Sequence, residues 1–139
     1  MKKGELITKI MTAQVVTINL KHSLSHAEAL FAKHKIRHIP VVNGQELIGM
    51  LSLTDLLRLS FMDNYGDDES SVDTAVYSML SVEQVMVSNP VTVQSEQSIK
   101  EVAEILASRE FHALPVIEGT KLVGILTTTD LIKYLLQQY

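Results

Sequence analysis

The sequence contains no cysteine and no tryptophan, and aromatic residues make up only 5% of its 139 residues. The absence of cysteine excludes disulfide bonds and thiol chemistry. No apolar run approaches the roughly 20 residues that a membrane-spanning helix needs. Residues 1–5 are followed by no apolar stretch of the kind that a secretory signal carries. We therefore expect a cytoplasmic protein with an aliphatic core and no membrane association.

Positive charge is also scarce, because 12 Lys and Arg face 16 Asp and Glu and give a formal net charge of −4. This balance argues against non-specific nucleic-acid binding. Residues 60–84 contain no Lys or Arg and hold six of the acidic residues, at positions 63, 67, 68, 69, 73 and 83. We interpret residues 61–80 as an acidic linker with a short helix from Asp73 to Leu80, whose Val76, Met79 and Leu80 face the core. Its carboxylates lack the spacing of a calcium-binding loop.

One stretch occurs twice, 75 positions apart and without gaps. Residues 38–57 read HIPVVNGQELIGMLSLTDLL, and residues 113–132 read ALPVIEGTKLVGILTTTDLI. The matched pairs include Pro40 with Pro115, Gly44 with Gly119, Gly49 with Gly124, and Asp55 with Asp130. A fixed internal period of this kind indicates a tandem repeat.

Each copy predicts a β-hairpin followed by a helix. The apolar runs 39–42 and 47–51 suit buried strands, and the glycine between them suits a tight turn. Thr54 and Thr129 are predicted as helix N-caps, with an Asp in the first helical turn. Gly49 and Gly124 are expected to allow close approach between a strand and a helix.

A further strand and helix precede each hairpin. The strands are predicted at 15–18 and 90–93. The first helix follows Ser23 and has an apolar face, and the second follows Ser98, which forms a capping-box pattern with Glu101. The apolar faces comprise Leu24, Ala27, Leu30 and Phe31 in the first helix, and Ile99, Val102, Ile105 and Leu106 in the second. The predicted fold class is α+β, with two strand-helix-strand-strand-helix motifs at 6–60 and 81–137.

The two copies of a Pro-Val strand, a glycine turn, a Leu-x-Gly strand and a Ser/Thr-x-x-Asp element resemble a tandem pair of CBS domains, named after cystathionine beta-synthase. The resemblance extends from about Leu6 to Leu136 and looks like a stand-alone pair. It implies that the two motifs pack about a pseudo-twofold axis into one module with two clefts. It also implies a homodimer, and regulation of an unidentified effector protein.

The resemblance further implies that the clefts bind adenine nucleotides or adenosyl compounds such as AMP, ADP, ATP or S-adenosylmethionine, with no required cofactor. In the family the Asp of Ser/Thr-x-x-Asp accepts from the ribose hydroxyls, and the helix N-terminus faces the phosphate. Residues just before each Pro line the adenosine pocket of the opposite motif. The expected sets are Ile36, Arg37, His38, Thr127, Thr129 and Asp130 for one cleft, and Phe111, His112, Ala113, Ser52, Thr54 and Asp55 for the other. Thr17 and Thr92 are secondary candidates for adenine contacts.

The run Lys33–His38 makes the first cleft the more basic one, so we expect it to bind nucleotide more tightly, through Arg37 and Asp130. Simpler interpretations remain open. The Asp residues would stabilise helix N-termini in any protein, Arg37 would suit a solvated helix end, and Phe111 would suit the core. The histidine pairs 22/26 and 34/38 have no evident third ligand, which favours surface histidines over a metal site.

The recurring polar residues suit ligand binding, and no nucleophile with its base is visible, so we expect no enzymatic activity. The favoured function is an energy-sensing or ligand-sensing regulatory module. One alternative is a structural dimerisation or protein-interaction module without ligand. Another is a nucleic-acid binder that uses Lys33–His38, which would show strongly salt-dependent affinity.

Overall fold

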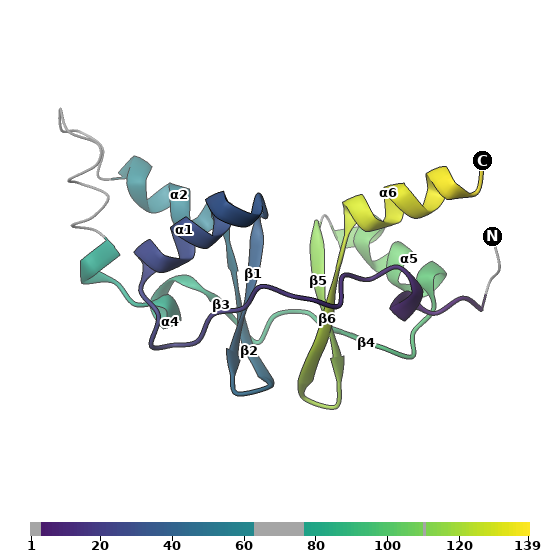
Figure 1. The fold of residues 1–139 in the computed structure, drawn as a ribbon, viewed down its shortest axis with the longest axis horizontal. Helices are drawn as coiled ribbons and strands as arrows, with labels where there is room; N and C mark the ends of the chain where they lie inside the picture. The colour runs from purple at the N-terminus through teal and green to yellow at the C-terminus, as the bar shows by residue number, and fades with distance from the viewer. Residues whose placement is uncertain (1–3, 63–76, 110) are drawn as a thin grey trace. The chain divides into compact units, whose positions relative to one another are not determined.

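The computed structural model of the chain describes residues 4–62, 77–109 and 111–139. It divides into two compact units. The N unit comprises Val16–Pro90, and the C unit comprises the residues up to Val15 together with Val91–Tyr139. Each unit combines a small sheet with helices, which confirms the predicted α+β class (Figure 1). Within the described residues no helix has both the length and the apolar character needed to cross a membrane.

The N unit is built around the predicted hairpin. Its elements are α1 (Leu24–His34), β1 (His38–Asn43), β2 (Glu46–Ser52), α2 (Leu53–Met62), α4 (Val82–Val85) and β3 (Val87–Ser88). Strands β1 and β2 are antiparallel, and Gly44 adopts a φ of 63° in the turn between them. β3 pairs antiparallel with β2. Ile18 adds a parallel bridge to Val41 of β1.

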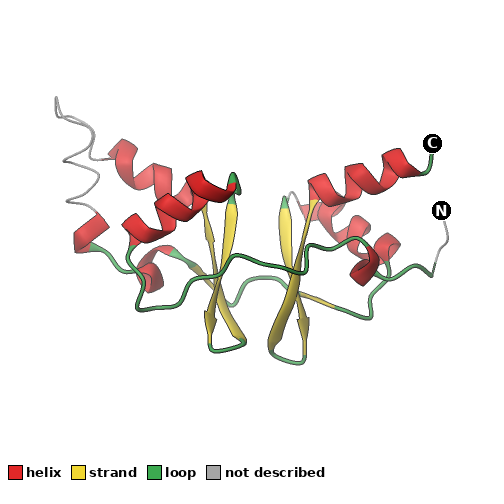
Figure 2. Cartoon of the chain, in the orientation of Figure 1, coloured by secondary structure: helices red, strands yellow, loops and turns green. Residues whose placement is uncertain are grey.

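The C unit repeats this arrangement (Figure 2). Its elements are the 3₁₀ turn η1 (Ile7–Lys9), β4 (Val93–Gln94), α5 (Ile99–Arg109), β5 (Ala113–Glu118), β6 (Lys121–Thr127) and α6 (Thr128–Gln137). β5 and β6 form the antiparallel hairpin, and β4 runs parallel to β5. Thr12 bridges to Ile125 of β6, at the position that β3 occupies beside β2 in the N unit.

The first segment of each repeat packs in the unit formed by the rest of the other repeat. Residues 5–12 begin the first motif in sequence but belong to the C unit, where Ile7 is fully buried. The Ile7 amide donates to the Gln97 carbonyl at 3.0 Å, and the Ile99 amide donates to the Glu5 carbonyl at 2.8 Å. Residues 82–88 belong in turn to the N unit, where Val82 is fully buried. Each motif is therefore completed by a segment that the sequence attaches to the other.

Each unit has its own core, dominated by aliphatic side chains as the composition predicts. The N-unit core contains Ile18, Leu24, Ala27, Phe31, Ile39, Val41, Leu51, Leu56, Tyr77 and Val82. The C-unit core contains Ile7, Val93, Ile99, Val102, Leu106, Leu114, Val116, Leu126 and Tyr134. The predicted apolar faces of α1 and α5 are confirmed, since their members are buried or packed against these cores.

Two predicted elements are placed differently. The strand expected at 15–18 is reduced to the single bridge of Ile18. Directly after it, the Asn19 side chain accepts from the Lys21 amide in a turn that prevents the pairing from continuing. Its counterpart starts at Val93, at the end of the predicted range 90–93.

In the linker, half of the predicted helix 73–80, including Val76, and most of the acidic run lie outside the described residues. Within the described part, Met79 is 80% exposed and was wrongly assigned to the core. Tyr77 is buried instead, and its hydroxyl donates to the Glu28 carboxylate at 2.7 Å.

Candidate functional site

The start of α6 is held by a reciprocal capping box. The Thr127 hydroxyl accepts from the Asp130 amide at 3.1 Å, and the Asp130 Oδ2 accepts from the Thr127 amide at 3.0 Å. The N-cap is thus Thr127, and the prediction of Thr129 was wrong by two residues. The strand continues to Thr127 and the helix begins at Thr128, so Thr129 lies inside the first turn.

Helix α2 is capped from the equivalent position, but the carboxylate of Asp55 is held differently from that of Asp130. The Ser52 hydroxyl accepts from the Asp55 amide at 3.0 Å, so Ser52 caps this helix and the prediction of Thr54 was also wrong. The Asp55 Oδ1 lies 3.5 Å from Nη1 of Arg58, whose side chain is 72% exposed. Sequence analysis missed Arg58, although an (i, i+3) spacing from Asp55 is a recognised signal for an ion pair. Such exposed pairs contribute little to stability.

The first-turn amides of both helices are mostly occupied. The first amide of α2, that of Leu53, donates to the Arg37 carbonyl at 2.8 Å, and the first amide of α6 donates to the His112 carbonyl at 3.0 Å. The third amide in each helix donates to the capping hydroxyl. The second amides, those of Thr54 and Thr129, donate to no residue that the structure describes, and both threonines are exposed. Each helix start therefore offers one free N–H and one neighbouring hydroxyl to a ligand.

The carboxylates of Asp55 and Asp130 each add a hydrogen-bond acceptor beside the threonine whose amide has no described partner. In Asp130 the second oxygen, Oδ1, accepts no hydrogen bond from the described residues. Both Asp55 and Asp130 are half-buried, so their carboxylates are held in place and still reach the surface. A helix start of this kind can bind hydroxyl groups through the carboxylate and a partial negative charge through the amide and hydroxyl.

The remaining predicted residues gather at the same end of each sheet. His38 lies opposite Ser52 in the β1–β2 register, and Ala113 lies opposite Thr127 in the β5–β6 register. Thr17 and Thr92 precede the residues that pair in parallel with β1 and β5. The N unit thus contains Ile36, Arg37, His38, Ser52, Thr54 and Asp55 at this end, with Thr17 level with Pro40. The C unit contains Phe111, His112, Ala113, Thr127, Thr129 and Asp130 at this end, with Thr92 level with Pro115. The predicted combination of Arg37 with Asp130 joins different units and stays a prediction.

Exposure separates these residues into two groups. Ile36 and Phe111 are half-buried and pack against the two cores, which agrees with a structural role. Arg37 and His112 are exposed. Arg37 makes no ion pair with any described residue, so its guanidinium is free to meet an anion.

The histidines at the start of α1 form a local pair. The His22 Nδ1 accepts from the Asn19 amide at 3.0 Å, and the ring centroids of His22 and His26 lie 4.5 Å apart. Across residues 4–62, 77–109 and 111–139, no three His, Asp or Glu side chains form a metal-binding group.

The family model of the CBS domain matches the chain twice, at residues 7–61 and 82–137. The CBS domain-containing protein YhcV from Bacillus subtilis is 30% identical over 122 residues, which cover 87% of this chain and 79% of YhcV. The chain spans less than half the length of the first curated relatives that it matches.

Two solved structures share the fold across nearly the whole chain. The crystal structure of CBSX2, a protein of Arabidopsis thaliana, in complex with AMP superposes with a TM-score of 0.80 at 24% identity, covering 97% of this chain and 98% of that one. The CBS domain pair of protein MJ0100, in complex with 5′-methylthioadenosine and S-adenosyl-L-methionine, superposes with a TM-score of 0.72 at 21% identity. It covers 94% of this chain and 98% of that one.

Proposed function

Because the chain belongs to the CBS domain family and carries two CBS motifs in tandem, we propose that it is a regulatory module that senses adenine nucleotides or other adenosyl compounds. The observation that carries this proposal is the pair of helix starts. In each, an exposed threonine with a free amide lies beside a half-buried aspartate at one end of a sheet. The recurring groups hold a ligand and supply no nucleophile with its base, so we propose binding without catalysis.

The ligand class follows from the donors and acceptors present. A carboxylate oxygen can accept from the two adjacent hydroxyls of a ribose, and the threonine amide and hydroxyl can donate to a phosphate or carboxylate oxygen. The solved relatives support this class, because AMP, 5′-methylthioadenosine and S-adenosyl-L-methionine share the adenosine group.

We further propose that Arg37 strengthens binding of phosphorylated ligands. Its guanidinium is exposed and unpaired among the described residues, and its backbone carbonyl is fixed by the Leu53 amide at the start of α2. Replacement of Arg37 by Ala should therefore weaken binding of AMP more than binding of S-adenosylmethionine, which carries no phosphate. Equal loss for both ligands would contradict a role in phosphate recognition.

Thermal unfolding tests the function itself. Purified protein, shown to be free of co-purified nucleotide, would be unfolded with AMP, ADP, ATP, S-adenosylmethionine or NAD. Binding to the native state alone stabilises it by roughly 2.7 kcal/mol at a hundredfold excess over the dissociation constant. The proposal expects a raised melting temperature with at least one adenosyl ligand. No shift with any of them would contradict it.

A second candidate function, dimerisation or protein interaction, is favoured by a separate observation. Ile132, Leu135 and Leu136 of α6 are 56%, 42% and 69% exposed, and their spacing places them along one stripe of the helix. Such a stripe would be buried in a homodimer or against an effector protein. Light scattering of the wild type and of Leu136→Glu would test this, since a dimer through α6 should dissociate in the variant and an unrelated interface should not.

A further inference from the structure

A methionine side chain occupies the space above a glycine in each unit, at equivalent positions of the repeat. A β-carbon added to Gly124 would lie 2.5 Å from the Sδ of Met11, and a β-carbon added to Gly49 would lie 2.4 Å from the Sδ of Met86. Met11 and Met86 are 75 positions apart, as are the two glycines. Each sulfur therefore lies directly against backbone that only glycine leaves open. At Gly49 the contact comes from the C-cap residue of α4, which agrees with the expected approach of a helix, whereas at Gly124 it comes from the segment after the 3₁₀ turn η1.

The two methionines lie at the points where the exchanged segments join the hairpins. Thr12, the residue after Met11, exchanges two hydrogen bonds of 2.9 Å with Ile125, the residue after Gly124. In the N unit, the residue after Met86 pairs in the same way with the residue after Gly49. The methionine contact and the backbone pairing thus form one clasp in each unit, with the thioether covering the strand beside the hydrogen bonds.

We propose that Met11 and Met86 are oxidation sites. Their conversion to methionine sulfoxide releases the exchanged segments, residues 5–12 and 82–88, from the hairpins against which they pack. A peroxide transfers one oxygen to the thioether sulfur, so that hydrogen peroxide becomes water and the thioether becomes a sulfoxide. The product is polar and larger at the atom that contacts the glycine. It would have to bury an S=O dipole against an apolar strand or leave the clasp.

Exposure supplies internal controls. Met11 and Met86 are half-buried, so each keeps part of its side chain at the surface, and the proposal requires a small oxidant to reach the sulfur in the folded protein. Met50 is only 7% exposed and should react slowly, whereas Met79 is 80% exposed and should react before Met11, Met50 and Met86. Oxidation of Met79 should have no effect on the clasps, because its side chain lies in solvent.

The test combines hydrogen peroxide titration, peptide mass spectrometry and hydrogen exchange of the whole chain. Oxidation of Met11 and Met86 should lower the melting temperature and speed amide exchange in residues 5–12 and 82–88 by about tenfold or more. The Met11→Leu, Met86→Leu double variant keeps an apolar side chain of similar volume without an oxidisable sulfur, and it should lose this response. Met79→Leu should retain it.

Three results would overturn the proposal. One is an equal response of the double variant and the wild type to peroxide. Another is oxidation of Met11 and Met86 no faster than that of buried Met50. A third is complete oxidation of both sulfurs without faster exchange of the two segments. Because these readouts require no ligand, they are independent of the proposed nucleotide sensing.

Discussion

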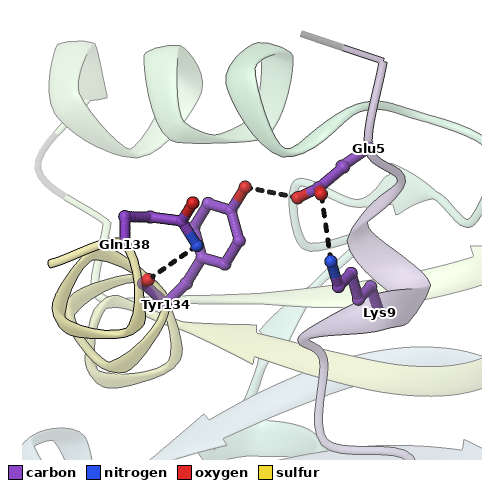
Figure 3. A network of polar contacts seen from close by, with 4 residues as sticks. All are labelled: Glu5, Lys9, Tyr134 and Gln138. Atoms are coloured by element: carbon purple, nitrogen blue, oxygen red, sulfur yellow. Dashed lines mark hydrogen bonds and ion pairs between the residues drawn. The ribbon is translucent and has the colours of Figure 1, made fainter. Parts of the chain in front are cut away.

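The hydroxyl of Tyr134 on α6 donates a hydrogen bond to a carboxylate oxygen of Glu5, although 129 positions separate the two residues (Figure 3). The other carboxylate oxygen of Glu5 accepts from the Lys9 ammonium at 3.0 Å. Tyr134 is buried in the C-unit core. This contact ties the exchanged segment to the last helix, and it raises the pKa of Tyr134 above the ordinary value of 10.0. The main cause is the hydrogen bond to Glu5, followed by burial and by the negative charge of Glu5.

This shift predicts how stability depends on alkaline pH. A tyrosine pKa raised by folding stabilises the protein below the unfolded pKa, and the stabilisation is lost as pH rises through the folded pKa. Tyr134→Phe should therefore be less stable than the wild type near neutral pH and should lose less stability as the pH rises above 10.0, the ordinary pKa of tyrosine. Urea unfolding at neutral and at alkaline pH measures both effects. Parallel pH profiles for the two proteins would show that the contact does not contribute.

The two glycine contacts predict unequal effects of the same substitution. At Gly124 the added β-carbon would meet the Thr12 carbonyl at 3.0 Å as well as Met11, and backbone cannot move as easily as a side chain. Gly124→Ala should cost about 1–3 kcal/mol of unfolding free energy.

The matched substitution is Gly49→Ala, where the nearest atoms all belong to the Met86 side chain. It should cost less, and the further change Met86→Ala should not add its full single-variant cost. Chemical denaturation of the wild type, Gly124→Ala, Gly49→Ala, Met86→Ala and the Gly49→Ala, Met86→Ala double variant measures these costs. Equal costs at the two glycines would contradict the assigned contacts.

The corrected helix caps are tested by a pair of threonines two residues apart. Thr127→Ala removes the hydroxyl that accepts from the Asp130 amide and should cost about 1 kcal/mol. Thr129→Ala removes an exposed hydroxyl without a described partner and should change stability by less than about 0.5 kcal/mol. The reverse order in denaturant unfolding would restore Thr129 as the cap.

Lys35 ends α1 in the left-handed conformation, with φ of 54° and ψ of 44°. A non-glycine residue is disfavoured there, whereas glycine is the usual residue at such a helix end. Lys35→Gly should therefore stabilise the protein by about 0.5–1 kcal/mol, after allowance for the greater freedom of glycine in the unfolded chain. A loss of stability would mean that the lysine makes a compensating contribution.

The parts of the fold that sequence analysis predicted correctly depend on local signals. The glycine turns, the apolar faces of α1 and α5 and the caps at Ser23 and Ser98 are each determined within a few neighbouring residues. The repeat then extended each local prediction to a second copy. The positions of Ser52 and Thr127 opposite His38 and Ala113 follow from equally local features, because the strand-to-helix junction places them at the end of each hairpin.

The parts that could not be predicted depend on contacts between distant positions. Nothing near Ile7 indicates that it is buried beside residues 97–99, because its partner surface is assembled only in the folded C unit. The choice between Thr127 and Thr129 as cap depends on where the preceding strand ends, which its pairing with β5 decides. The ion pair of Asp55 with Arg58 is an exception, because its (i, i+3) spacing is a local signal that the sequence does contain.

The most direct test of the central claim is calorimetric titration of the nucleotide-free protein with AMP and with S-adenosylmethionine. The Asp55→Asn, Asp130→Asn double variant keeps an oxygen that can accept from the helix start while removing both charges. We predict saturable binding of at least one ligand to the wild type and an affinity reduced about tenfold or more in the variant. Absence of binding by the folded wild type, or an unchanged affinity in the variant, would contradict ligand sensing at these two helix starts.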